Sequence, residues 1–147
     1  MHLPDANRES FAELLRERGI TPTHQRVEIA RALLARKQHL SADEILVVVN
    51  HRHAETSKAT VYNTLKLFLD RGLIREVIVD PSRVFYDSNT APHHHLFDLD
   101  RGVLTDIDAD QVTVTGLPPL PDGMRTVGVD VIVRIKSSDQ PGLAALP

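Results

Sequence analysis

Three consecutive histidines, His93–His95, are the residues of this sequence with the clearest capacity for chemistry. In an extended strand, alternate side chains point to the same face, so His93 and His95 would share a face and His94 would point away. Two imidazoles spaced in this way can bind one metal ion. Acidic residues that could complete such a site lie nearby in the sequence, at Asp87, Asp98, Asp100, Asp106, Asp108 and Asp110.

The lack of cysteine limits which metal this cluster suits. The 147 residues include eight histidines and no cysteine, which excludes disulfides, thiolate zinc sites and Fe–S clusters. Imidazole and carboxylate ligands without sulfur suit Fe(II), Mn(II) or Zn(II), and not Cu(I). The alternative interpretation of the triplet is a hydrated polar turn. Surface positions are expected for the isolated histidines His2, His24, His51 and His53.

A second candidate for chemistry is the helix predicted from Ser57 or Lys58 to Arg71, with Gly72 as its stop. Its apolar stripe is Val61, Leu65, Phe68 and Leu69, and Asn63 projects from the opposite side. Asparagine can form two hydrogen bonds with adenine, and the ring of Tyr62 can pack on a thymine methyl group. Both contacts favour an A/T-rich site in double-stranded DNA. Candidate phosphate contacts are Thr23, Arg26, Lys58, Thr60 and Lys66.

The alternative interpretation of this helix is that Tyr62 is half-buried in the core and the lysines and threonines are merely hydrated. The order of the neighbouring elements favours DNA binding. Three helices are expected before it, and a hairpin follows it, which is the order of a winged helix-turn-helix. The first helix is expected to begin at an Asn7 cap and end at Gly19, the second to begin at Thr21–Pro22–Thr23, and the third at the capping box Ser41–Glu44. The hairpin is expected as strands Ile74–Val79 and Arg83–Asp87 around the turn Asp80–Pro81–Ser82.

From His93 onward the sequence predicts a small sheet. Strand-like runs occur at Leu96–Leu99, Val103–Ile107 and Gln111–Thr115, and a Pro/Gly-rich connector covers 117–123. Val127, Val129, Val131, Val133 and Ile135 then alternate with other residues, as in a half-buried strand. A sheet of this size has too little core to be stable alone, so we expect a homodimer.

These elements predict an α+β protein, with an N-terminal winged helix-turn-helix followed by a small α/β dimerisation domain. The expected bounds are 1–88 for the DNA-binding domain, 89–92 for a hinge, 93–136 for the dimerisation domain and 137–147 for a flexible tail. The net charge is −3, divided into +1 over residues 1–80 and −4 over residues 81–147. The DNA prediction therefore rests on the motif and not on overall charge.

The chain has no run of roughly 20 apolar residues that could cross a bilayer, and its start, Met1–Asp5, does not resemble a signal peptide. We therefore expect a cytoplasmic location and no membrane partner.

Several motifs together resemble the ferric uptake regulator (Fur) family, over about residues 11–136 and in the family's order and spacing. Within it the chain looks most like the iron response regulator (Irr) branch. Three features suggest the branch, namely the triple histidine, Asn63 after Tyr62 and the shortened ending Leu117–Met124. The motifs that carry the family resemblance are Gly19–Arg26, His39–Glu44, Ala59–Leu65 and His93–His95.

The resemblance implies one metal site per subunit, between the two domains, at His39, Asp87, His93, His95 and Asp106. A second site of some relatives looks incomplete, because His94 matches one of its positions and no histidine follows residue 95. The cysteine pairs that hold a structural zinc in many relatives are absent. In the Irr branch the histidine triplet is linked with haem as well as iron, so haem at His94 and its neighbours is an alternative ligand.

These observations predict a regulator and not an enzyme: a metal-responsive, specifically iron-responsive, transcriptional repressor of iron- or haem-related genes. Metal at the hinge would fix the spacing of the two DNA-reading helices of the dimer, one from each subunit, and so control the affinity for the operator. Alternatives are a haem-responsive regulator and a metal-independent winged-helix regulator. A metallohydrolase is a remote alternative, since the sequence shows neither a separate general base in a catalytic motif nor a large α/β scaffold.

Overall fold

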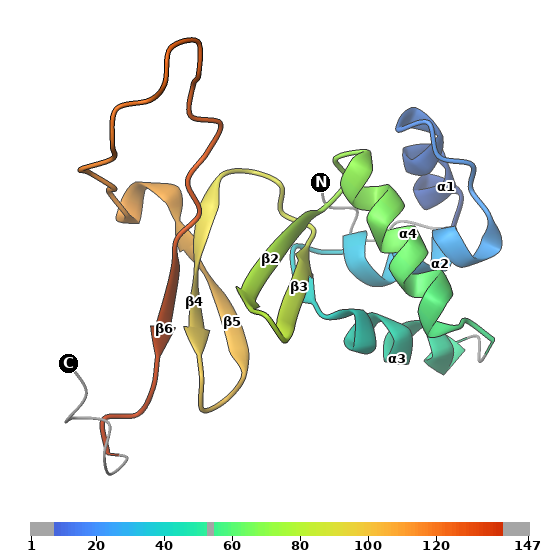
Figure 1. The fold of residues 1–147 in the computed structure, drawn as a ribbon. Helices are drawn as coiled ribbons and strands as arrows, with labels where there is room; N and C mark the ends of the chain where they lie inside the picture. Colours follow the sequence, from blue (N-terminus) through green and yellow to red (C-terminus); the bar gives the residue numbers. More distant parts are fainter. Residues whose placement is uncertain (1–7, 53–54, 140–147) are drawn as a thin grey trace. The chain divides into compact units, whose positions relative to one another are not determined.

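The structure is a computed structural model that describes residues 8–52 and 55–139 (Figure 1). Its internal contacts divide the chain into two compact units, Met1–Thr90 and Ala91–Pro147. The expected domain bounds stay a prediction. Within the described part of the chain, no helix is long and apolar enough to span a membrane.

The first unit contains four helices, α1 (Arg8–Glu17), α2 (His24–Leu34), α3 (Ala42–Arg52) and α4 (Lys58–Asp70). Each of the last three begins where a polar side chain accepts a hydrogen bond from a backbone N–H that the helix leaves unpaired. Thr23 accepts from Arg26 N, and Ser57 accepts from Thr60 N. The capping box is confirmed, because Ser41 Oγ accepts from Glu44 N at 3.1 Å and Ser41 N donates to Glu44 Oε1 at 3.0 Å. The expected Asn7 cap lies outside the described residues.

The four helices pack around one apolar core that also includes Tyr86 from the hairpin. The buried side of α4 differs in one position from the predicted stripe. Val61, Leu65 and Phe68 are fully buried, but Thr64 is buried beside them and Leu69 is only partly buried. The 3.6-residue period explains the change, since position 64 lies three residues after Val61 and four before Phe68.

A three-stranded antiparallel sheet completes the first unit, in the order β1-β3-β2. The hairpin consists of β2 (Arg75–Asp80) and β3 (Arg83–Asp87), and its turn is held by Asp80. The N–H and the hydroxyl group of Ser82 both donate to Asp80 Oδ1, at 2.9 and 2.8 Å. The third strand, β1 (His39–Leu40), was not predicted from the sequence.

The second unit is a sheet of β4 (His93–Asp98), β5 (Val103–Asp108) and β6 (Ile132–Ile135), in the order β5-β4-β6. Strand β4 pairs antiparallel with β5 and parallel with β6. A short 3-10 helix, Ala109–Gln111, follows β5, and a long loop then leads to β6 (orange in Figure 1).

One predicted strand of this unit, Gln111–Thr115, does not form, and a second, the valine run, is shorter than predicted. Gln111 ends the 3-10 helix, and no strand forms over 112–115. The alternating valine run forms a strand only at Ile132–Ile135, where it pairs with His95–Asp98 of β4. Val127, at the start of the run, is 89% exposed. Part of the expected tail, residues 140–147, lies outside the described residues.

Candidate functional site

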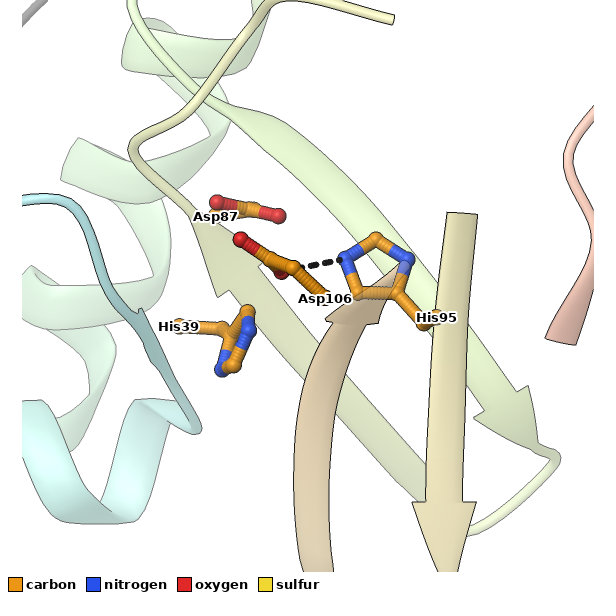
Figure 2. Close-up of side chains that lie close together, drawn as sticks. All are labelled: His39, Asp87, His95 and Asp106. Atoms are coloured by element: carbon orange, nitrogen blue, oxygen red, sulfur yellow. Dashed lines mark ion pairs between the residues drawn. The ribbon is translucent and has the colours of Figure 1, made fainter. Parts of the chain in front are cut away.

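In the first unit, two of the predicted metal ligands face each other across the strand pair β1–β3. His39 in β1 is the register partner of Asp87 in β3 (Figure 2). Directly opposed residues of an antiparallel pair have Cβ atoms about 4.5–5.5 Å apart, so an imidazole and a carboxylate are offered together. Asp87 is 1% exposed, and its Oδ1 accepts a hydrogen bond from Asn89 N at 2.9 Å. We call His39 and Asp87 the first half-site.

The backbone around His39 is held by Gln38 and Ser88, which sequence reasoning missed. Ser88 N donates to Gln38 O at 3.0 Å, and Gln38 N donates to Ser88 Oγ at 3.0 Å. The Gln38 side chain also donates to Ala32 O and Leu33 O, at 2.8 and 3.2 Å. These bonds join β1, β3 and the end of α2, so the position of His39 is set by three elements.

In the second unit, His93, His95 and Asp106 form the second half-site. The alternation of β4 places His93 and His95 on one face, as predicted, with ring centroids 4.5 Å apart. Both histidines are buried, at 6% and 5% exposure. Asp106 in β5 is the register partner of His95, and its Oδ1 lies 3.6 Å from His93 Nε2 and 3.5 Å from His95 Nε2. Figure 2 shows Asp106 directed at the ring of His95.

The second half-site suits a metal ion in one further respect. His93 Nδ1 lies 2.6 Å from Ala91 O. A neutral imidazole that donates its Nδ1 proton to this carbonyl keeps a lone pair on Nε2, the atom nearest Asp106. A backbone carbonyl that fixes the second nitrogen is the usual support of a metal-binding histidine.

His94 points to the other face of β4, where its Nδ1 accepts a hydrogen bond from Val131 N at 3.1 Å. Of the other acidic candidates, Asp98 Oδ1 accepts from the backbone N–H groups of Asp100 and Arg101 in the β4–β5 turn. Asp100 in turn accepts from Ser137 N at 2.7 Å. Asp108 is the register partner of His93.

The predicted DNA-reading residues lie on the exposed side of α4. Tyr62, Asn63 and Lys66 are exposed, and Tyr62 retains 45% of its accessible surface. Lys58 Nζ lies 5.9 Å from the centre of the Tyr62 ring and 3.3 Å from Asp43 Oδ1. Tyr62 is therefore not a core residue.

The threonines among the candidate phosphate contacts also stabilise helix starts. Thr23 caps α2, and Thr60 Oγ1 lies 2.9 Å from Ser57 Oγ at the start of α4. Arg26 Nη1 donates to Thr21 O at 2.9 Å. These side chains thus lie beside helix N-termini, where backbone N–H groups and the helix dipole favour phosphate.

Comparison with known proteins gives a consistent result. Residues 17–120 match the Ferric uptake regulator family. Peroxide-responsive repressors PerR of Staphylococcus epidermidis (strain ATCC 12228 / FDA PCI 1200) and Staphylococcus aureus (strain Mu50 / ATCC 700699) are 35% and 36% identical over 104 residues. The aligned part is 71% of this chain and 69% and 70% of those repressors.

Solved structures share the fold. A zinc-bound manganese uptake regulator is 27% identical, with a TM-score of 0.65 over 86% of this chain and 98% of its own. The ferric uptake regulator of Pseudomonas aeruginosa with manganese is 21% identical, with a TM-score of 0.64 over 86% and 96% of the two chains.

Proposed function

Because the chain belongs to the ferric uptake regulator family, whose members are metal-responsive transcriptional regulators, we propose that one divalent ion per subunit controls its affinity for an operator. The regulator acts as a homodimer and as a repressor. The operator is A/T-rich double-stranded DNA, read by Tyr62 and Asn63 on the exposed side of α4.

The composition of the two half-sites carries this proposal. The first half-site offers one imidazole and one buried carboxylate, and the second offers two imidazoles and one carboxylate. Divalent transition metals take about four to six ligands, so neither half-site completes a coordination shell alone. We propose that one ion takes ligands from both, with His39, Asp87, His93, His95 and Asp106 as the candidate ligands.

An ion shared by the two half-sites explains how metal binding would change the affinity for DNA. Both the first half-site and α4 belong to the first unit, whereas the second half-site belongs to the unit that we assign to dimerisation. Residues of both units held by one ion would lose freedom of relative movement, which selects one spacing of the two α4 helices in the dimer. Metal binding and DNA binding are then coupled, so that binding of either one changes the affinity for the other by the same factor.

The donor atoms suit Fe(II), Mn(II) and Zn(II), and a structural relative is described as a zinc-bound manganese uptake regulator. We propose Fe(II) or Mn(II) as the ion in the cell, and iron- or haem-related genes as the targets. Haem is the competing effector, and membership of the iron response branch stays a prediction.

The test is operator binding by the full chain with added Mn(II), with Fe(II) and after chelation. Metal should change the dissociation constant at least about fivefold, which corresponds to about 1 kcal/mol of coupling. His39→Ala and His95→Ala should each abolish the change, and the exposed His51→Ala serves as the matched control that keeps it.

Metal affinity measured by calorimetry on the same variants separates two ways of being wrong. A His39→Ala protein that binds the ion with unchanged affinity would confine the ion to the second half-site and refute sharing. A wild-type protein whose operator affinity ignores metal, and responds to haem instead, would refute metal control.

A further inference from the structure

A pocket of about 340 Å³ opens within the first unit, between α2, β1 and α3. This volume is at the low end of the range for small-molecule sites, roughly 300–1,000 Å³. One part of its lining is apolar, with Ala32, Leu40 and Val48 as examples. The other part is charged and includes Glu28, Arg31 and Arg52.

The charges around Glu28 do not balance. Its side chain is 5% exposed, with Oε1 at 3.2 Å from Arg8 Nη1 and Oε2 at 3.7 Å from both Arg31 Nε and Arg52 Nε. One carboxylate thus faces three guanidinium groups, and Arg36 on the same pocket lining adds a further positive charge. One carboxylate balances only one of these positive charges, so the partly exposed guanidinium groups give this part of the pocket a positive potential that favours an anion.

Arg31 gives an independent indication of the same ligand. Its Nε is buried and has no hydrogen-bond partner among the described residues, because Glu28 Oε2 at 3.7 Å is too distant. A buried donor without an acceptor costs free energy, which a bound acceptor would recover if the Arg31 side chain turned its Nε toward the pocket. A carboxylate suits a guanidinium best, since its two oxygens can accept two parallel N–H groups.

We propose that this pocket binds a small organic carboxylate, with its acid group at Arg31 and Arg52 and an apolar body against Ala32, Leu40 and Val48. An inorganic anion such as phosphate would meet the charged part but leave the apolar part uncovered. The inference goes beyond the proposed function, because the pocket contains none of the metal half-site residues and none of the DNA-reading residues of α4.

The probe is benzoate, with benzamide as its neutral counterpart, titrated into the metal-free full chain by calorimetry at low salt. Benzoate should bind with a dissociation constant of about 1 mM or tighter. Its affinity should exceed those of benzamide and of inorganic phosphate by at least about tenfold, or about 1.4 kcal/mol. Methyl resonances of Val48 should shift on titration, and those of Val127, which is 89% exposed in the second unit, should not.

Arg52→Gln should weaken benzoate binding about tenfold, or about 1.4 kcal/mol. Lys37→Gln, which removes an exposed cation outside the pocket lining, should change it less than about twofold. Circular dichroism should show that both variants fold like the wild type. Equal binding of benzamide, equal binding of phosphate, or an unchanged affinity in Arg52→Gln would each overturn the proposal. Because metal is absent throughout, failure here leaves metal control of DNA binding intact.

Discussion

Replacing Glu28 by glutamine tests whether the buried charge cluster stabilises the first unit. The substitution keeps the shape of the side chain and removes its charge. Three guanidinium groups would then surround a neutral amide, at positions that now lie 3.2 to 3.7 Å from the carboxylate. We expect the variant to be less stable than the wild type.

The exposure of the partners sets the size of the effect. Breaking a fully buried ion pair costs about 3–5 kcal/mol, whereas an exposed pair contributes at most about 1 kcal/mol. Glu28 is 5% exposed, but the side chains of Arg8, Arg31 and Arg52 are 45%, 25% and 55% exposed and can regain hydration. The expected loss in free energy of unfolding is therefore about 1–3 kcal/mol.

Intrinsic tyrosine fluorescence can report the unfolding of the first unit. It has no tryptophan and two tyrosines, Tyr62 and Tyr86, both in that unit. Urea titration followed by tyrosine fluorescence should thus report the unfolding of the first unit. The urea midpoint should fall by about 1 M, given a slope of about 1–3 kcal/mol per molar for small domains.

Glu13→Gln is the matched control, because Glu13 pairs with Arg16 at 3.1 Å but both side chains are largely exposed. It should change stability by less than about 0.5 kcal/mol. If Glu28→Gln costs no more than this control, the cluster does not stabilise the fold and the reasoning from burial is wrong. If it raises stability, desolvation of Glu28 outweighs its attraction to the three arginines.

Three further predictions concern α4 and the β2–β3 turn. Asn63→Ala should weaken operator binding by about 1–3 kcal/mol in a gel-shift assay, and an equal loss on random DNA would count against a base contact. Ser57→Ala removes the acceptor for Thr60 N at the start of α4 and should cost about 1 kcal/mol in urea titration, whereas Ser57→Asp should largely retain the cap. Hydrogen bonds from Ser82 lower the pKa of Asp80, so this contribution to the wing turn is complete above the unfolded-state pKa and is lost as the pH falls through the lower folded-state value. A carboxyl NMR titration of Asp80 with its midpoint at the ordinary aspartate value would contradict that prediction.

The helices and the hairpin could be predicted from the sequence because their signals act over a few residues. The Ser41–Glu44 capping box, the Ser57 cap and the apolar period of α4 each operate within one or two helical turns. The shared face of His93 and His95 followed in the same way from strand alternation. Local chemistry alone therefore determined most of the elements and the shared face of the two histidines, whereas Asp106 joins them through the pairing of β4 with β5.

Long-range pairing was decided only by the tertiary structure. The two-residue strand at His39 exists because Gln38 and Ser88, 50 residues apart, bond to each other, and nothing local predicts that contact. The valine run forms a strand only where β4 supplies paired positions, although its alternation extends further. Sequence patterns record which face a side chain prefers, but partners distant in the chain decide whether that face is covered. The pocket beside Glu28 has the same origin, since packing of α2 against α3 brings Arg52 to a carboxylate that the sequence places far away.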